Sequence, residues 1–308
     1  MKNVLIFGVS GFVGNYLAQE FIDAGYKVYG SDITDNPNLL LDISFQNADL
    51  MNSADVKMIV DEVAPDMIIN LAAISSVGAS WSMPQTTMNV NVIGALNIME
   101  ASRTCDKKPK VMFIGSSEEY QVWDASIDES TPLDANNPYG ISKMTQESFA
   151  ALYRDRYDMQ IYCVRPFNHT GIGQKDGFVL PSFCKQVAEI AKSGKSGVMK
   201  VGNLSAKRDF SHVKDIVRGY RMIIESDDCR QVYNIGSGNA YSIREVLDYI
   251  ISLCPYEVTV ETDPDRFRPV DTPVICCNNS KIKERLGWEP QYSIFDTVRE
   301  MYNYYLNV

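Results

Sequence analysis

The stretch Val4-Leu5-Ile6-Phe7-Gly8-Val9-Ser10-Gly11-Phe12-Val13-Gly14 decides the fold of this chain. Its apolar run ends in glycine, as buried parallel strands often do, and residues 16–22 continue with helical apolar spacing. Gly8, Gly11 and Gly14 are therefore expected on a strand-to-helix turn. Glycines in such a turn let the backbone approach a pyrophosphate, and the helix start offers it free N–H groups.

An acidic residue follows the glycine loop where a dinucleotide would place its adenosine ribose. The apolar run Lys27-Val28-Tyr29-Gly30 predicts a second strand that leads to Asp32, about twenty residues after the loop. A carboxylate at this position accepts hydrogen bonds from the ribose and repels a 2′-phosphate. The glycines alone could also form a purely structural turn, but the strand, the helix and the acid together indicate a dinucleotide site.

A second motif, Tyr139-Gly140-Ile141-Ser142-Lys143, indicates the chemistry. Pro138 suits a helix start, and residues four apart share one helix face, so the Lys143 ammonium can lie near the Tyr139 phenol. The cation is expected to lower the pKa of the tyrosine toward working pH, as general acid–base catalysis requires. The alternative is a tyrosine that packs on a helix next to a solvated lysine.

Ser116 is expected to complete this site. Residues 110–115 form an apolar run that predicts a strand, and sites in open α/β sheets form where strands end. The Ser116 hydroxyl can then bond the same substrate oxygen as Tyr139. These residues predict hydride transfer between a nicotinamide cofactor and a carbonyl or alcohol, with NAD(H) preferred to NADP(H) because of Asp32.

These motifs make the chain similar, over essentially its full length, to extended short-chain dehydrogenase/reductases that act on nucleotide sugars. The resemblance implies further cofactor contacts at Asp42, which typically meets the adenine amine, and along Asn70-Leu71-Ala72-Ala73, a strand end beside the cofactor. The cofactor-binding residues that it implies are Gly8, Gly11, Phe12, Val13, Gly14, Asp32, Asp42, Ile43, Leu71, Ala72, Ala73, Tyr139 and Lys143.

Within this family, several segments most resemble GDP-4-keto-6-deoxy-D-mannose reductases, among them residues 115–120, 167–174 and 201–210. The resemblance implies reduction at C4 to a product of the GDP-D-rhamnose type: Tyr139 donates the proton, Ser116 orients the carbonyl and Lys143 holds the ribose. It also implies a set of contacts to the sugar nucleotide, with the two arginines on the diphosphate. These substrate-binding candidates are Asn168, Val179, Lys185, Arg208 and Arg268.

Glu118 leaves a second reaction open, because the matching glutamate of 4,6-dehydratases in this family removes the C5 proton. The shorter chain and Asp32 favour the reductase, since GDP-mannose dehydratases are longer and usually carry arginines that grip NADP. Two further candidates are an NAD-dependent UDP-sugar epimerase and a non-catalytic dinucleotide sensor. Glu118 counts against the epimerase, and the presence of both Tyr139 and Lys143 counts against the sensor.

Strand-like and helical runs alternate from Met1 to about Arg165, which predicts an α/β fold with a doubly wound parallel sheet of the Rossmann type. Residues 1–165 and about 209–236 are expected to form the dinucleotide-binding domain. Residues 166–208 and 237–308 are expected to form a smaller α/β domain for the sugar nucleotide. Because the two domains interleave along the chain, no clean linker is expected between them.

Two of the predicted helices bear on assembly. Thr86 to Ser102 and the helix that holds Tyr139 are the pair that commonly forms a four-helix dimer interface in this family, so a homodimer is expected. Their spacing fits apolar faces packed within one subunit equally well. Another, shorter helix is expected from Ser182 to Ser193.

Composition narrows the partners and the compartment. The net charge of −10 over 308 residues argues against nucleic acid and anionic membranes as partners, and an anionic sugar nucleotide must find local cations. Met1-Lys2 leads directly into a strand, and no apolar run approaches the roughly 18 residues that span a bilayer, so a cytoplasmic protein is expected. Seven cysteines without a CxxC pair indicate reduced thiols, and with only two histidines no histidine-based metal site is expected.

Overall fold

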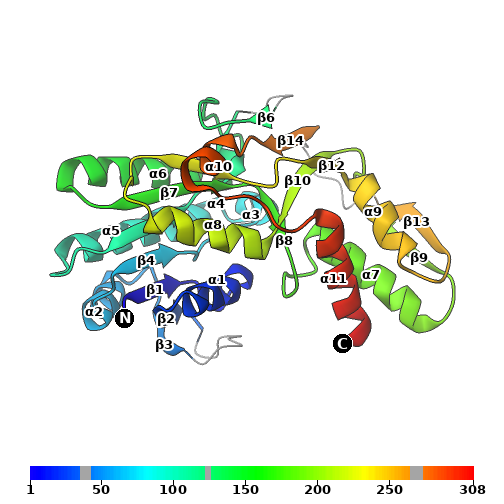
Figure 1. The fold of residues 1–308 in the computed structure, drawn as a ribbon, viewed down its shortest axis with the longest axis horizontal. Coiled ribbons are helices and arrows are strands. Elements are labelled where there is room, and N and C mark those ends of the chain that lie inside the picture. Colours follow the sequence, from blue (N-terminus) through cyan, green and yellow to red (C-terminus); the bar gives the residue numbers. More distant parts are fainter. Residues whose placement is uncertain (35–42, 122–125, 264–272) are drawn as a thin grey trace.

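The computed structural model describes residues 1–34, 43–121, 126–263 and 273–308 (Figure 1). Its largest element is a parallel sheet with the strand order β11-β7-β5-β4-β1-β2-β3. The order reverses between β1 and β4, and ligands of open α/β sheets bind at such a switch point. The predicted α/β class with a doubly wound parallel sheet is confirmed. The seven strands are β1 (Asn3–Phe7), β2 (Lys27–Asp32), β3 (Ser44–Asn47), β4 (Met67–Asn70), β5 (Lys110–Ile114), β7 (Ile161–Pro166) and β11 (Val232–Ile235).

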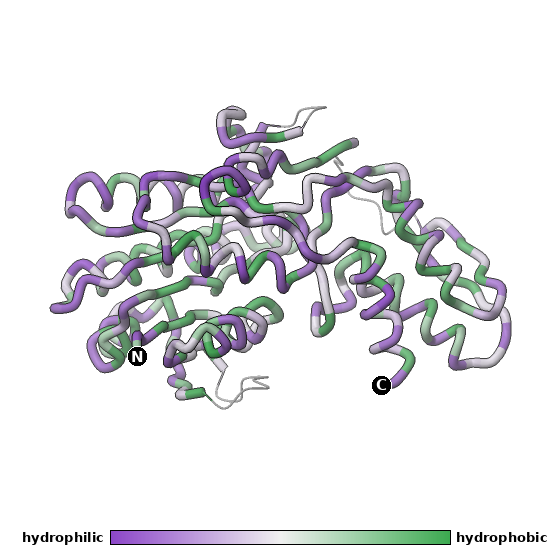
Figure 2. Tube along the Cα trace, viewed as in Figure 1, coloured by the Kyte–Doolittle hydropathy of each residue, from purple (hydrophilic) through white to green (hydrophobic). Residues whose placement is uncertain are grey.

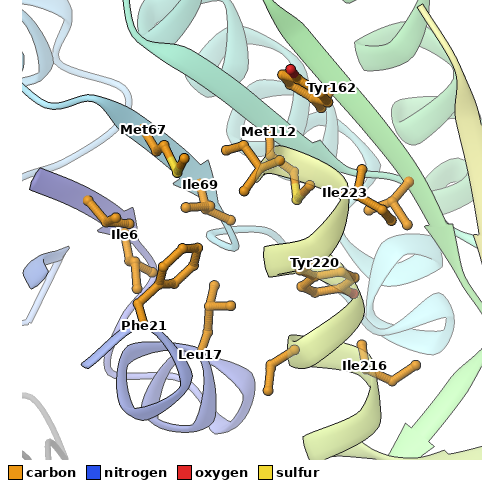
Figure 3. Close-up of a cluster of buried hydrophobic side chains, with 14 of the residues drawn as sticks. Ile6, Leu17, Phe21, Met67, Ile69, Met112, Tyr162, Ile216, Tyr220 and Ile223 are labelled. Atoms are coloured by element: carbon orange, nitrogen blue, oxygen red, sulfur yellow. The ribbon is translucent and has the colours of Figure 1, made fainter. Parts of the chain in front are cut away.

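One face of this sheet is covered by α1 (Phe12–Asp23) and α8 (Val213–Glu225). Val4 and Ile6 of β1 point to this side, where they pack with the two helices. In Figure 3 the side chains of α1 and α8 face one another across this core, below strands β1, β4 and β5. The labelled helix residues there are Leu17, Phe21, Ile216, Tyr220 and Ile223.

The other face is covered by α2 (Ser53–Val63), α5 (Gly94–Thr104) and α6 (Pro138–Tyr157). Leu5 and Phe7 alternate with the residues of the first face and pack against these helices. Because both faces are buried, a central strand such as β1 is apolar along most of its length rather than alternating between apolar and polar residues.

A second sheet and a helical unit follow. Figure 1 shows α7, α9, α11 and the β9–β13 pair together at one end of the molecule, away from the seven-stranded sheet, where they enclose an apolar core of their own. Along α7 and α11, hydrophobic and hydrophilic stretches alternate (Figure 2). The elements are β6 (Ser126–Ile127), β8 (Asn168–Thr170), β10 (Lys207–His212), β12 (Ala240–Ser242) and β14 (Val274–Cys277) in the second sheet, β9 (Gly197–Val201) and β13 (Val258–Thr262) in the pair, and α7 (Val179–Ser193), α9 (Ile243–Ser252) and α11 (Ile294–Asn307).

The packing departs from the predicted domain division around α10 (Ser280–Leu286), and also at β6 and β10, which both lie in the second sheet. Ile282 of α10 and the following Trp288 fall within the range 237–308, but both are buried in the core that α1 and α8 share. The Trp288 indole N–H donates to Asp215 O of α8 at 3.0 Å. The segment around α10 therefore packs with the larger sheet, because a buried indole needs both an apolar pocket and an acceptor.

Two predicted helices begin earlier than expected. The helix predicted from Thr86 begins at Pro84 as α4 (Pro84–Met88). A π-helical turn, η1 (Asn89–Ile93), joins α4 to α5. A short helix that was not predicted, α3 (Val77–Ser82), precedes α4. The helix predicted from Ser182 begins at Val179 as α7. Such a π turn adds a residue to the local helix and escapes a search for regular apolar spacing. Among the described residues, none of the helices combines the length and the apolar character required to cross a membrane.

Candidate active site

The glycine loop joins β1 to α1 at the switch point of the sheet. Gly8 has a φ of +80°, and a Cβ on it would lie 2.6 Å from Ala72 N, just beyond β4. A Cβ on Gly14 would lie 2.3 Å from Val9 O. Both positions therefore exclude any side chain. Gly11 is the N-cap of helix α1 and no side chain caps this end, so the first N–H groups of the helix remain available to an anion.

Asp32 ends β2 directly beside this loop. Its Oδ2 accepts a hydrogen bond from Ser10 N at 3.1 Å, and its Oδ1 accepts one from Ile33 N at 2.8 Å. The structure thus brings the predicted ribose-binding carboxylate and the glycine loop together.

The other cofactor candidates lie around the same strand ends. Leu71 follows β4, and its N–H donates to Phe7 O at 2.9 Å, which fixes Leu71, Ala72 and the neighbouring Ala73 beside the loop. Phe12 stacks on His169 with ring centroids 6.4 Å apart. The candidates Phe12, Val13, Ile43 and Leu71 are partly buried against the first core. Asp42 lies outside the described residues.

Ser116, Tyr139 and Lys143 are brought together from β5 and α6. Ser116 follows β5 and caps the short 3₁₀ turn η2 (Ser117–Glu119), while the other two residues lie in the first turns of α6. The Ser116 hydroxyl accepts a hydrogen bond from Glu118 N at 3.1 Å and lies near enough to the Tyr139 hydroxyl to lower its pKa. Lys143 Nζ donates to Ile114 O at 2.8 Å and lies 5.9 Å from the centroid of the Tyr139 ring. All three side chains are buried.

Asn137 links the start of α6 to Glu118. Its Oδ1 accepts from Gly140 N at 2.9 Å and so caps the helix, while its Nδ2 donates to Glu118 Oε2 at 2.9 Å. The half-buried Glu118 carboxylate is thereby held near Tyr139. Asn137 is not among the residues expected at the site, although an asparagine directly before a proline at a helix start is a capping signal.

Burial dominates the electrostatics of this site. It raises the pKa of the Tyr139 phenol, an effect larger than the lowering by the nearby Ser116 side chain. Burial also lowers the pKa of Lys143 to about 8, and the charge of Glu119 opposes this shift. The predicted lowering of the tyrosine pKa is therefore wrong for this structure, because burial of the phenolate, together with the charges of Glu119 and Glu118, outweighs the lowering by Ser116. A neutral phenol is a proton donor, the form that carbonyl reduction requires.

The substrate candidates lie in β8, β10 and α7. Asn168 of β8 pairs in register with Phe210 of β10, the strand that also holds the buried Arg208. Val179 is the first residue of α7 and is 37% exposed. Lys185 lies on the exposed surface of the same helix in an ion pair with Asp176 at 2.6 Å. Arg268 lies outside the described residues.

A buried charge cluster beside η2 was not expected from the sequence. Arg165 of β7 forms an ion pair with Glu147 of α6, and its Nε lies 3.8 Å from Glu119 Oε2. Its Nη1 donates to Tyr120 Oη at 2.9 Å. Glu119 Oε1 accepts from Ser116 N at 2.6 Å, which connects the cluster to the candidate catalytic serine. No local signal reveals it, because its members come together only through the packing of β5, β7 and α6.

Comparison with known proteins gives matches along the whole chain. A family model described as GDP-mannose 4,6 dehydratase matches residues 5–301. The GDP-6-deoxy-D-mannose reductase of Pseudomonas aeruginosa is 28% identical over 301 aligned positions, which cover 97% of this chain and 95% of that protein. A GDP-mannose 4,6-dehydratase of Vibrio cholerae is 28% identical over 350 positions, which cover 97% of this chain and 92% of that protein.

Solved structures also match this chain over almost its whole length. The structure of RMD from Pseudomonas aeruginosa complexed with NADPH superposes with a TM-score of 0.87 at 26% identity, covering 100% of this chain and 99% of that one. The UDP-glucose 4-epimerase of Thermotoga maritima with UDP-glucose gives a TM-score of 0.89 at 23% identity, covering 99% of each chain. The likeness to the epimerase, at 23% identity, shows a shared fold and nothing more. Both superpositions include the seven-stranded sheet and the helical unit around α7.

Proposed function

The chain belongs to the GDP-mannose 4,6 dehydratase family, and we propose that it reduces the C4 keto group of GDP-4-keto-6-deoxy-D-mannose, giving a product of the GDP-D-rhamnose type, with NAD(P)H as hydride donor. The resemblance to extended short-chain dehydrogenase/reductases is thereby confirmed. The observation that carries the proposal is the buried group of Ser116, Tyr139 and Lys143, in which Lys143 Nζ lies 5.9 Å from the centroid of the Tyr139 ring.

The lengths of the two alignments favour a reductase over a dehydratase. The reductase of Pseudomonas aeruginosa aligns over 301 positions, fewer than the 308 residues of this chain. The dehydratase of Vibrio cholerae needs 350 positions to cover the same 97% of the chain. That dehydratase therefore carries insertions that this chain and the reductase lack.

The glycine loop fits a nicotinamide dinucleotide. A backbone that leaves no room for a Cβ at Gly8 and Gly14, and a helix start without a side-chain cap, suit a pyrophosphate. Bound NAD(P)H supplies the hydride. Asp32 is assigned to the adenosine ribose and Lys143 to the nicotinamide ribose. The remaining contacts are assigned to Gly11, Phe12, Val13, Asp42, Ile43, Leu71, Ala72, Ala73 and Tyr139.

The chain's own contribution is to orient the carbonyl and to supply the proton. Ser116 donates a hydrogen bond to the C4 oxygen, which positions it against the Tyr139 hydroxyl. Tyr139 then donates its phenolic proton to that oxygen as the carbonyl carbon is reduced, so that the keto group becomes a hydroxyl. The raised pKa of Tyr139 supports this direction, because the group remains protonated until the reaction.

The sugar nucleotide is assigned to the side of β10 and α7. Arg208 is assigned to the diphosphate together with Arg268, because a guanidinium can hold two phosphate oxygens at once. Asn168 is assigned to the sugar-nucleotide backbone. Val179 at the beginning of α7 and Lys185 farther along this helix are assigned to the sugar nucleotide as well, with the lysine near the base.

We also infer a homodimer formed through the outer face of α6. Ile141 and Leu152 on this helix are 46% and 62% exposed, and large apolar side chains gathered on one face indicate an interface. Light scattering on the purified protein tests this inference, since a monomer would contradict it. A hollow on the outer face of α6 is lined by Asp134, Ala135, Ile141, Met144, Thr145, Ser148, Phe149 and Leu152.

We place the protein in the cytoplasm, where seven reduced thiols are expected.

Cofactor consumption tests the proposed reaction. A reductase oxidises one NAD(P)H for each sugar, whereas a dehydratase takes a hydride from C4 and returns it to C6. Incubation with GDP-4-keto-6-deoxy-D-mannose should therefore remove the absorbance of the reduced cofactor stoichiometrically, and GDP-mannose with NAD or NADP should give no keto sugar.

The second candidate is the dehydratase, which the placement of Glu118 near Tyr139 favours. Conversion of GDP-mannose to its 4-keto-6-deoxy form without net cofactor use would establish it and overturn the reductase. Glu118→Gln would then abolish the conversion, because no other group is assigned to remove the C5 proton. In a reductase the same change should alter turnover by less than about tenfold.

A further inference from the structure

The segment that begins with Asn168 contacts the helix that begins at the glycine loop. Residues 168–174, here called the β8 segment, start with β8 and follow the carboxyl end of β7. β7 pairs with β5, the strand that ends beside Ser116. Sites of open α/β sheets form at such strand ends. The β8 segment therefore belongs to the edge of the sheet at which the candidate active site lies.

Two aromatic side chains of α1 hold the β8 segment. Tyr16 Oη donates to Ile172 O at 2.9 Å. The Phe12 ring meets the Tyr16 ring edge-on, with centroids 5.7 Å apart, and stacks on His169. Phe12 and Tyr16 are four residues apart and therefore share the face of α1 that contacts the segment. The Tyr16 hydrogen bond joins residues 156 positions apart in the sequence.

The β8 segment lies close against two helices. A Cβ on Gly171 would lie 2.8 Å from Cγ1 of Val213, the first residue of α8, and 3.6 Å from Cζ of Phe12. The absence of a side chain at Gly171 therefore lets the main chain of the segment approach both α1 and α8.

Gln174 holds the β8 segment together internally. Its Oε1 accepts from Thr170 Oγ1 at 2.7 Å, and its Nε2 donates to His169 O at 3.2 Å. These bonds connect the end of the segment to β8 at its start. We therefore expect a displacement at Ile172 to reach Asn168 as well.

We propose that Tyr16 is a positioning residue for the sugar nucleotide: its hydroxyl fixes the β8 segment against α1 and thereby places the Asn168 side chain. The inference rests on the proposed function, because it takes Asn168 as a contact of the sugar nucleotide. Tyr16 is not among the residues assigned to the cofactor, and it acts on the substrate through the segment. Helix α1 thus receives the pyrophosphate at its beginning and locates the sugar nucleotide one turn further on.

Tyr16→Phe removes the hydroxyl and keeps the ring. Ile172 O then loses its side-chain donor, and substrate binding has to order a segment that is held less firmly. KM for the GDP-sugar should therefore rise about three- to tenfold. Turnover at saturating substrate and binding of the reduced cofactor should stay within about twofold, because Ser116, Tyr139 and the glycine loop are unchanged. An unchanged KM would overturn the proposal.

Tyr26→Phe is the matched control. Tyr26 follows α1, is half-buried like Tyr16, and donates its hydroxyl to Glu225 Oε1 of α8 at 2.7 Å. Both tyrosines pack against the same core, so both variants should unfold at a somewhat lower temperature. Only Tyr16→Phe should change KM. Equal KM values in the two variants would show that the Tyr16 hydroxyl has a structural role alone, and the proposal would be wrong.

Gly171→Ala displaces the β8 segment by a different route. The added Cβ meets Val213, so KM for the GDP-sugar should rise about tenfold or more. Gly177→Ala is its control, because a Cβ there meets nothing within 4 Å, and its KM should stay within about twofold. If Gly171→Ala also keeps the original KM, the placement of the segment does not matter for binding and the proposal fails.

Binding measured without turnover separates this inference from the proposed reaction. Calorimetric titration of GDP-mannose in the presence of NADH or NADPH should give a Kd about three- to tenfold higher for Tyr16→Phe than for Tyr26→Phe and the unchanged protein. If the 4-keto sugar is not reduced but this difference is present, the proposed reaction is wrong and the role of Tyr16 stands. If the unchanged protein binds the reduced cofactor but no GDP-mannose, the proposed substrate class fails and the inference with it. Equal dissociation constants in all three proteins would overturn the inference alone.

Discussion

The glycine loop and the beginning of α7 are built in different ways. At the loop, the fit depends on the main chain: Gly8 leaves no space against Ala72, and Gly14 leaves none against Val9. At α7, long side chains stand on the surface, where Lys185 pairs with Asp176 and Phe178 is 41% exposed. A new atom in the loop meets backbone that cannot move aside, whereas a new side chain on the exposed face of α7 meets solvent. Cofactor binding should therefore tolerate little change, and substrate preference should change readily.

Tyr139→Phe should have the largest effect and should leave the loop untouched. The change deletes the proton donor but keeps the ring, so turnover should fall by about 10² or more. Binding of the reduced cofactor, measured by fluorescence, should stay within about twofold because the loop is unchanged. Near-normal turnover would show that another group supplies the proton.

Gly8→Ala tests the main-chain fit directly. Gly8 and Gly25 have φ values of +80° and +83°, but a Cβ meets Ala72 N at 2.6 Å in the first and nothing within 4 Å in the second. Gly8→Ala should weaken dinucleotide binding by about ten- to a hundredfold, from backbone strain and the displaced strand end together. Gly25→Ala carries the same strain alone and should lower only the unfolding temperature. Equal binding by the two variants would refute a fit built from the main chain.

Asp32→Ala should change the ratio of the dissociation constants for NADH and NADPH about tenfold. The unchanged protein is expected to bind NADH more tightly than NADPH, because the carboxylate repels a 2′-phosphate. Sequence positions 31–43 contain no lysine or arginine to offset that repulsion. The ratio of the two dissociation constants, determined for both proteins, checks this. Tighter binding of NADPH by the unchanged protein would contradict the role given to Asp32.

Lys185→Ala tests the α7 region and should have the smallest effect of these substitutions. An exposed ion pair contributes little to stability, so unfolding should be unaffected, while KM for the GDP-sugar should rise about threefold. Lys192→Ala, which removes another exposed lysine of the same helix, is the control. If both variants keep the original KM, Lys185 has no part in binding the nucleotide.

The predictions that succeeded rest on local spacing. The apolar run before Gly8 and the helical pattern after Gly14 are neighbours in sequence, and residues close in sequence determine whether a strand, a turn or a helix forms. The same holds for Tyr139 and Lys143, whose separation by one helical turn places them together whatever surrounds them. The sheet and the candidate catalytic group could therefore be predicted from the sequence.

What the sequence did not reveal depends on packing. The ion pair of Arg165 with Glu147 and its approach to Glu119 require β7 to lie next to β5 under α6. The direction of the Tyr139 pKa shift depends on how deeply the phenol is buried, which spacing does not report. The place of Trp288 in the first core depends on a contact with α8 across 73 residues of chain.

That tryptophan also bears on how the protein is made. Trp288 and Ile282 complete an apolar core whose other members include β1, α1 and α8, and β11 at the edge of the sheet is formed from residues 232–235. A ribosome synthesises the glycine loop long before Trp288, so the nascent chain holds an unfinished core while the residues between them are made. The core around the glycine loop is therefore complete only once the segment around Trp288 has been made.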